Sequence, residues 1–199
     1  MRRVVPETKM KRLVIGISGA SGVIYGVRML EVLRGKIETH LVITERAKQT
    51  LSYETDVIAG AVESLASFVH SDNDLSSPLA SGSFKTLGMI IIPCSIKTLS
   101  AVANCYSQTL IARAADVNLK ERRRVVLVVR ETPLHLGHLR LMVRVAEMGG
   151  VVLPPIPAFY SRPKTIADII DHTVGKVLDL FEIQHQLFRR WREKVPDTS

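Results

Sequence analysis

Residues 88–131 read GMIIIPCSIKTLSAVANCYSQTLIARAADVNLKERRRVVLVVRE, and this stretch decides the fold. The runs Met89–Ile92 and Val125–Val129 are short, continuous and largely β-branched, which is typical of strands covered on both faces. A long helical region that ends in cations separates them. In a parallel sheet both strands bring their polar ends, residues 93–95 and 130–132, to one carboxyl edge, where open α/β sheets bind ligands. We therefore expect the functional site at that edge.

The rest of the chain alternates between strand and helix patterns. Further strands are predicted at Arg12–Ile17, Thr39–Ile43 and Val151–Leu153, and further helices at Val23–Leu33, 46–53, 137–148 and 165–181. In the last helix an apolar face is formed by Ile166, Ile169, Ile170, Val174, Val177 and Leu178. We expect a short helix at Val62–Phe68 and no ordered structure in the polar loop Asp72–Ser83. The alternation predicts an α/β fold with a doubly wound parallel sheet.

The composition is that of an ordinary globular protein, with 46% hydrophobic and 23% charged residues in a chain of 199. Residues 1–199 are expected to form a single domain, with an N-terminal extension over 1–11 and a tail over 184–199. No apolar run approaches the ~18 residues of a membrane span, and the basic N-terminus lacks the apolar region of a signal peptide. We expect a protein without a membrane span, located in the cytoplasm.

The net charge of +8 suggests nucleic-acid binding at first sight. However, the densest basic run, Lys120–Arg124, falls where a helix is expected to end, and cations there complement the helix dipole. Aromatic residues are few and are not interleaved with the basic ones, so the stacking surfaces that bind single strands are missing. Basic residues at strand ends suit a small phosphorylated ligand, and no nucleic-acid partner is expected.

Metal and redox chemistry are not expected either. Cys94 and Cys105 form no CxxC pair, so both are expected to be buried or half-buried free thiols. His135 and His138 stand three apart, like two metal ligands on one helical turn, but no third ligand stands at a matching spacing.

A turn of small residues, Ser18–Gly22, follows the first strand and precedes a helix. Such a turn lets a phosphate reach backbone N–H groups at a helix N-terminus, where the dipole favours an anion. The spacing Gly16-x-x-Gly19-x-x-Gly22 also fits a dinucleotide fingerprint, with Glu45 as the acid for a ribose. A tight turn without a ligand is the alternative.

Several polar residues near strand ends have both a structural and a functional interpretation. Ser95 and Thr98 either cap the following helix or contact a ligand. Arg130-Glu131 is either an ion pair or part of a site, and Lys120 is a solvated helix terminus in the structural interpretation. Phe159-Tyr160, among prolines, either packs as a plug or holds its phenol at a site. Spacing alone leaves these alternatives open.

Taken together, several motifs resemble those of the UbiX/Pad family of flavin prenyltransferases. They are SGASG with Tyr25-Gly26, Glu54-Thr55-Asp56, Ala80-Ser81-Gly82-Ser83, PCSIKTLSAVA, RAADVNLKERR, VVRETPLHLGHL, PPIPAFY and VGKVLDL. The resemblance runs from about Arg12 to Trp191. It implies a flavodoxin-like or Rossmann-like three-layer αβα fold in a homododecamer, with FMN and substrate bound between subunits. An older name for such proteins is aromatic-acid (3-octaprenyl-4-hydroxybenzoate) decarboxylase subunit.

The resemblance implies a metal-independent prenyltransferase that joins a dimethylallyl group from dimethylallyl phosphate to N5 and C6 of reduced FMN. The product, prenylated FMN, would be the cofactor of UbiD-type decarboxylases. Carried over by motif, the FMN contacts are Gly19, Ala20, Ser21, Thr44, Ser95, Ile96, Lys97, Thr98 and Arg130. The residues for the substrate phosphate are Lys120, Arg130, Tyr160 and Lys176, and the catalytic residues are Glu54, Lys120 and Glu131.

The implied chemistry agrees with the residue types. Preorganised lysine and arginine donors stabilise a leaving phosphate without a metal. A carboxylate near the flavin, here Glu131, is the natural base for the proton that is lost on ring closure. Lys176 stands where some relatives have arginine, so a point charge replaces a bidentate fork.

Two other functions remain as alternatives. An FMN-dependent cysteine decarboxylase of the same fold would carry a PxMNxxMW-type substrate clamp, whereas residues 131–142 read ETPLHLGHLRLM. A non-catalytic FMN carrier subunit of an aromatic-acid decarboxylase would need the flavin turn but not the phosphate-binding set.

Overall fold

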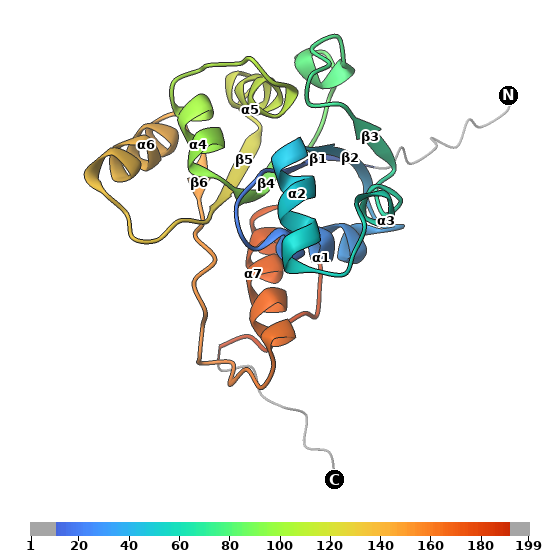
Figure 1. The fold of residues 1–199 in the computed structure, drawn as a ribbon, viewed down its shortest axis with the longest axis vertical. Coiled ribbons are helices and arrows are strands. Elements are labelled where there is room, and N and C mark those ends of the chain that lie inside the picture. Colours follow the sequence, from blue (N-terminus) through green and yellow to red (C-terminus); the bar gives the residue numbers. More distant parts are fainter. Residues whose placement is uncertain (1–10, 192–199) are drawn as a thin grey trace, which may run out of the picture.

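A parallel sheet of six strands forms the centre of the molecule, and helices cover both of its faces (Figure 1). This computed structural model describes residues 11–191. The strands lie in the order β3-β2-β1-β4-β5-β6, and all neighbouring pairs are parallel. They are β1 (Arg12–Ile17), β2 (Glu38–Ile43), β3 (Phe68–His70), β4 (Gly88–Cys94), β5 (Arg124–Val129) and β6 (Val151–Val152).

The strand order confirms the doubly wound fold. From β1 the chain winds outward through β2 and β3, then returns to β4 on the other side of β1 and winds outward through β5 and β6. The direction of winding therefore changes between β1 and β4. In open sheets of this kind, ligands bind in the crevice outside the carboxyl ends of the strands at that point.

The helices form one layer on each face of the sheet (Figure 1). They are α1 (Val23–Leu33), α2 (Glu45–Glu54), α3 (Ala59–Glu63), α4 (Ile96–Ala103), α5 (Leu110–Lys120), α6 (Leu136–Glu147) and α7 (Ile166–Leu180), with a 3-10 turn η1 (Pro78–Ala80). Successive strand side chains point to opposite faces, so Leu13 and Ile15 pack with α1 and α7, whereas Val14 packs with α4 and α5. Two cores separated by the sheet give the expected three-layer αβα arrangement.

Hydroxyl side chains fix where the helices next to the crevice begin. Thr44 Oγ1 accepts a hydrogen bond from Ala47 N at 3.1 Å at the start of α2. Ser95 Oγ accepts one from Thr98 N at 3.3 Å at the start of α4. Because α2 follows β2 and α4 follows β4, these caps bring two helix N-termini to the carboxyl edge.

The helical region predicted between β4 and β5 is divided into two helices. α4 ends at Ala103, and Cys105 takes a positive φ of 52° before α5 begins at Leu110. The expectation of a buried or half-buried thiol is confirmed for Cys94 and wrong for Cys105, which is exposed. Cys105 lies on the connection between two helices, and such connections run over the surface.

The prediction of a short helix at Val62–Phe68 is wrong. α3 ends at Glu63, and Phe68 begins the edge strand β3, which pairs with β2. Phe68 and Val69 are 52% and 46% exposed, so β3 lacks the buried pattern by which strands are recognised in a sequence.

The loop Asp72–Ser83 is ordered, contrary to expectation. The Asp72 carbonyl accepts a hydrogen bond from Leu110 N at 2.7 Å, and the Asp72 carboxylate accepts one from Ile111 N at 2.9 Å. These partners lie on α5, far along the chain, so local composition does not reveal them.

The last helix, α7, agrees with its predicted bounds and most of its predicted face. Val174, Val177 and Leu178 are buried, whereas Ile166 is 78% exposed because α7 begins beyond the sheet (Figure 1). The predicted extension over residues 1–11 and the tail beyond residue 191 lie outside the described residues, apart from Lys11. Within residues 11–191, none of the helices has both the length and the apolar character needed to cross a membrane.

Candidate active site

A buried serine joins the carboxyl ends of β1 and β4. Ser18 Oγ donates a hydrogen bond to the Pro93 carbonyl at 3.0 Å and accepts one from Ser95 N at 2.8 Å. Ser18 is 1% exposed. These bonds hold the small-residue turn after β1 against the start of α4, so two features that were predicted separately form one surface.

The turn ends at the N-terminus of α1. Gly22, the N-cap, has a φ of 93°, in the left-handed region that glycine tolerates. Glu54 Oε2 accepts hydrogen bonds from Gly22 N at 2.8 Å and Val23 N at 3.3 Å. The predicted catalytic residue Glu54 therefore lies at the positive end of the α1 dipole, beside the predicted flavin turn.

A cavity of about 760 Å³ lies beside this turn at the carboxyl edge. The predicted FMN contacts that line it are Gly19, Thr44, Ser95, Ile96, Lys97 and Thr98, and Glu131 lines it as well. Its volume falls in the range of small-molecule sites, roughly 300–1,000 Å³. Ala20, Ser21 and Arg130 are not among its lining residues. Ala20 and Ser21 continue the turn, and Arg130 N donates to the Cys94 carbonyl at 3.1 Å, at the same edge.

The lining suits a flavin. Its apolar members, which can pack on the isoalloxazine ring, include Ile43, Val69, Ile96 and Ile111. The hydroxyls of Thr44 and Ser95, with the helix N-termini that they cap, suit the polar groups and the phosphate. A Cβ on Gly19 would lie 2.5 Å from Arg46 Cβ, so glycine lets the turn pack closely against the start of α2.

One wall of the cavity consists of residues that sequence analysis missed. This wall comes from β3 and the loop after it, and its members are Val69, His70, Ser71, Asp72 and Asn73. His70 Nε2 lies 3.0 Å from His40 Nδ1, and His70 Nδ1 lies 2.9 Å from Ser77 Oγ. Burial lowers the pKa of both imidazoles, so they remain neutral near pH 7. The sequence predicted neither the strand β3 nor an ordered loop after it, so it gave no indication of this wall.

The structure brings Tyr160 and Lys176 to one face of α7. Tyr160 Oη lies 3.0 Å from His172 Nε2. Lys176 follows His172 by one helical turn, and its charge adds to the larger effect of burial in lowering the pKa of His172. Both predicted phosphate-binding side chains therefore border the same imidazole.

Arg130 lies within electrostatic reach of the contact between α1 and α7. Burial raises the pKa of Tyr25, on α1, while a hydrogen bond with Thr173 and the charge of Arg130 oppose that shift. Tyr25 thus links the end of β5 to α7.

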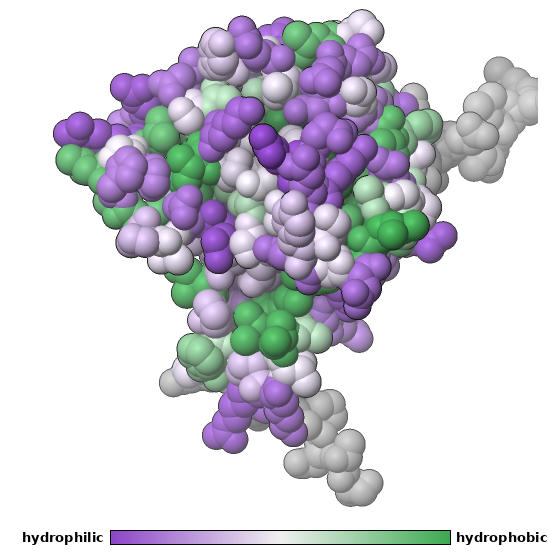
Figure 2. All heavy atoms as spheres, viewed as in Figure 1, coloured by the Kyte–Doolittle hydropathy of each residue, from purple (hydrophilic) through white to green (hydrophobic). Residues whose placement is uncertain are grey.

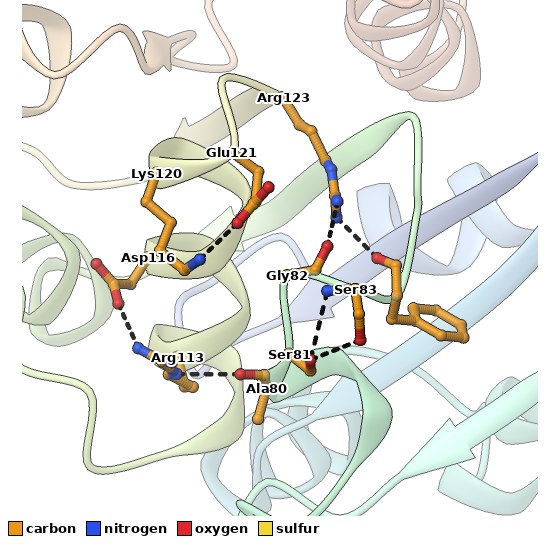
Figure 3. A network of polar contacts seen from close by, with 10 residues as sticks. Ala80, Ser81, Gly82, Ser83, Arg113, Asp116, Lys120, Glu121 and Arg123 are labelled. Carbon is orange, nitrogen blue, oxygen red and sulfur yellow. Dashed lines mark hydrogen bonds and ion pairs between the residues drawn. The ribbon is translucent and has the colours of Figure 1, made fainter.

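Lys120 lies at the amino edge of the sheet, opposite the carboxyl edge that bears the cavity. It is the last residue of α5, just before β5 begins at Arg124, and its Nζ lies 2.5 Å from Glu121 Oε1. Figure 3 shows this pair beside Gly82, where a Cβ would meet Lys120 Nζ at 3.0 Å. A single chain therefore does not bring Lys120 to the cavity that Glu131 lines.

A polar loop accompanies the lysine (Figure 3). Arg123 donates hydrogen bonds to the carbonyls of Gly82 at 2.6 Å and Phe84 at 2.7 Å. The hydroxyls of Ser81 and Ser83, which are exposed, lie 2.8 Å apart. Arg123 thus fixes a loop whose amides and hydroxyls can bind an anion next to the lysine.

His135 and His138 lie at the start of α6, and His135 caps this helix. His135 Nδ1 accepts a hydrogen bond from Gly137 N at 3.0 Å, at the N-cap of α6, and its ring contacts the His138 ring at an interplanar angle of 37°, with centroids 3.6 Å apart. No group of three or more His, Cys, Asp or Glu side chains that could hold a metal occurs in residues 11–191.

The fold and the cavity define a flavoprotein of the doubly wound α/β class. In agreement, the family model described as Flavoprotein matches residues 2–191. The chain is 58% identical over 187 residues to the flavin prenyltransferase UbiX of Escherichia coli (strain K12), covering 92% of this chain and 99% of that protein. It is 59% identical over 181 residues to the flavin prenyltransferase UbiX of Thauera aromatica, covering 90% and 93%. The chain belongs to the UbiX family of flavin prenyltransferases.

Solved structures show the same relationship. AnUbiX (PadA1), crystallised in complex with FMN and dimethylallyl pyrophosphate, has a TM-score of 0.92 and 47% identity, covering 94% of this chain and 100% of that one. A dodecameric FMN-dependent Ubix-like decarboxylase from Escherichia coli O157:H7 has a TM-score of 0.89 and 46% identity, covering 92% and 100%. The FMN-dependent cysteine decarboxylase TvaF, at 17% identity and a TM-score of 0.60 over 74% of this chain and 91% of that one, shares the fold alone.

Proposed function

We propose that this chain transfers the dimethylallyl group of dimethylallyl phosphate to N5 and C6 of reduced FMN, a reaction that needs no metal. The observation that carries the proposal is the cavity at the change of winding, lined by Gly19, Thr44 and Ser95 in a chain 58% identical to a flavin prenyltransferase. A related structure, 47% identical, contains both FMN and an allylic pyrophosphate.

The flavin side of the site is formed by the two capped helices and the turn after β1. Thr44 and Ser95 offer hydroxyls, and Gly19 lets the turn pack against α2 where both line the cavity. Reduced FMN, when bound, supplies the electron-rich ring that receives the allyl carbons. Lys97, exposed at the start of α4, adds a positive charge at the cavity that favours a reduced, anionic ring.

The phosphate side is formed by cations and a phenol. Arg130, Tyr160 and Lys176 come from one copy of the chain, and Lys120 comes from a neighbouring copy. Donors that are already in position stabilise the negative charge that develops on the leaving phosphate, without a metal. Lys176 contributes a point charge rather than a bidentate fork.

Glu131 is the base in this proposal. It lines the cavity, and its Oε1 accepts a hydrogen bond from Thr132 N at 3.0 Å, which holds the carboxylate at the end of β5. From there it takes the proton that ring closure releases. Glu54, fixed by the amides at the start of α1, adds a second negative charge beside the flavin turn.

Assembly of identical subunits completes the site. The distance of Lys120 from the cavity supports this, and so does an apolar stripe on α6. Leu136, Leu139 and Val143, spaced along one face of α6, are 60%, 45% and 55% exposed, and Figure 2 shows apolar side chains interspersed with hydrophilic ones at that end of the molecule. A related protein is dodecameric, and a homododecamer is the assembly that we propose.

The product is delivered to another enzyme. Prenylated FMN is a modified cofactor rather than a metabolite of its own, and we infer that a UbiD-type decarboxylase receives it. Delivery to such an enzyme agrees with the cytoplasmic location expected from the sequence.

The proposal is tested by mixing the protein anaerobically with reduced FMN and dimethylallyl phosphate and measuring the mass of the flavin. We expect a gain of one C5 unit. Glu131→Gln should lower the rate by about 100-fold or more, as loss of a general base does, while FMN affinity stays unchanged. Glu31→Gln, which affects only an exposed pair with Arg28 at 3.1 Å, is the matched control. An unchanged flavin mass with the native chain contradicts the proposed reaction, and a normal rate for Glu131→Gln contradicts the role of this residue.

A further inference from the structure

The phenol of Tyr160 is held by a buried imidazole that no expectation from the sequence included. His172 is 8% exposed, whereas Tyr160 is 43% exposed. Tyr160 Oη lies 3.0 Å from His172 Nε2, and the rings meet edge to face, with centroids 5.5 Å apart and an interplanar angle of 78°. The imidazole thus fixes the phenol from its buried side and leaves part of it open to a ligand.

The segment after α7 holds this pair in place. The ring of Phe188 packs on His172 with centroids 4.7 Å apart. Trp191 packs on Tyr160 edge to face, with centroids 5.5 Å apart at 83°. Each member of the pair therefore has an aromatic neighbour that limits its rotation.

Asp179 anchors that segment to α7. Its carboxylate lies 3.1 Å from His185 Nε2 and accepts a hydrogen bond from Arg190 at 2.7 Å. Gly175 has no side chain, and this leaves room on α7 for Phe188, because a Cβ at that position would lie 2.5 Å from the Phe188 ring. The contacts on the phenol and the imidazole are thus built into the fold.

The protonation state of His172 limits what the pair can do. Burial, then the charge of Lys176, lower its pKa, and the opposing effect of Asp179 is smaller. A neutral imidazole has one N–H donor and one acceptor nitrogen. The hydroxyl of Tyr160 has a single proton, so it can donate to a phosphate only if the imidazole donates to the phenol oxygen.

We propose that His172 is a positioning residue for the substrate phosphate: its Nε2–H donates to Tyr160 Oη and directs the phenolic proton to the phosphate of the allylic substrate. The inference rests on the proposed function and adds to it a residue that does not itself touch the substrate. Lys176, one turn along α7, has its charge within electrostatic reach of His172, so one helix carries both the cation and the support for the neutral donor.

The test compares two substitutions of His172 in the FMN-loaded protein. His172→Phe fills the space without a donor, whereas His172→Gln keeps an N–H. The KM for dimethylallyl phosphate comes from turnover, and its dissociation constant comes from calorimetry. His172→Phe should raise both about fivefold, the effect of one lost hydrogen bond, with a smaller change in kcat, and His172→Gln should restore most of the affinity. Ser64→Ala, which removes an exposed hydroxyl that donates to the Ala61 carbonyl at 2.7 Å, away from the Tyr160–His172 pair, should leave both values unchanged.

A double-mutant cycle shows whether His172 acts through the hydroxyl. In a Tyr160→Phe background, His172→Phe should weaken phosphate binding by less than twofold, because the hydroxyl that it orients is already gone. Equal losses with and without the hydroxyl, or a native KM for His172→Phe, overturn the inference. If the native protein fails to add the C5 unit, the proposed function is wrong. The calorimetric cycle is independent of turnover and still decides whether His172 supports the phenol.

Discussion

Replacing Ser18 with alanine should weaken both the fold and flavin binding. Ser18 Oγ makes two hydrogen bonds, to the Pro93 carbonyl at 3.0 Å and from Ser95 N at 2.8 Å, and the residue is 1% exposed. At about 1 kcal/mol for each bond, Ser18→Ala should lower the free energy of unfolding by about 2 kcal/mol. In a chain of this size that corresponds to a fall of about 4–8 °C in Tm. Because the same bonds hold the flavin turn against α4, FMN affinity should fall about tenfold.

The measurement is urea unfolding at one fixed protein concentration, since subunit association also contributes to stability. FMN affinity comes from quenching of flavin fluorescence. Ser64→Ala is the matched control, because the Ser64 hydroxyl is exposed and donates only to the Ala61 carbonyl of its own helix, at 2.7 Å. The control should change stability by less than about 0.5 kcal/mol. A Ser18→Ala protein that matches this control in stability and binds FMN normally would refute the importance of the bridge between β1 and β4.

Three further predictions concern other parts of the molecule. Lys120→Ala should raise the KM for dimethylallyl phosphate about tenfold or more, which is the effect of losing a hydrogen bond to a charged group. The dissociation constant of FMN should stay unchanged. A native KM in steady-state kinetics would show that Lys120 is not part of the site. Gly26→Ala should lower the free energy of unfolding by about 1–3 kcal/mol, because the new Cβ would lie 2.5 Å from the Ile92 carbonyl oxygen. This overpacking outweighs the ~1 kcal/mol by which alanine favours a helix over glycine. Urea unfolding measures the change, and a variant more stable than the native protein would contradict the prediction. Burial lowers the pKa of His40 and His70, so the unfolded chain binds protons more readily and stability should fall as pH drops below about 6.5, the unfolded value. Denaturation between pH 7.5 and 5.5 should show this loss, and His40→Gln should reduce it, whereas parallel curves for both proteins would contradict the assignment.

The sheet could be predicted because each of its central strands is an apolar run that can be recognised from the local sequence alone. All seven residues of β4 are buried, and the sequence shows this as an unbroken apolar run. β3 carries no such signal, since it has three residues and two of them are more than 40% exposed. It exists because the backbone of β2 offers partners along its free edge, a fact about tertiary structure that a local pattern cannot contain.

The candidate site divides in the same way. Gly19, Thr44 and Ser95 follow strand ends directly, so the rule for parallel sheets predicts that they lie together, and they line one cavity. His70 and His172 were missed because their roles depend on neighbours distant in the sequence, His40 and Tyr160. A single histidine on an apolar element gives no sign of which side chain it will meet.

The contacts of Phe188 and Trp191 with the phenol–imidazole pair bear on the order in which the molecule matures. The cavity is lined by residues between Ser18 and Glu131, whereas Phe188 and Trp191 lie more than 50 residues further along the chain and are synthesised later, at roughly 5–20 residues per second. The residues of the flavin cavity are therefore complete before the aromatic contacts that hold the Tyr160–His172 pair can form.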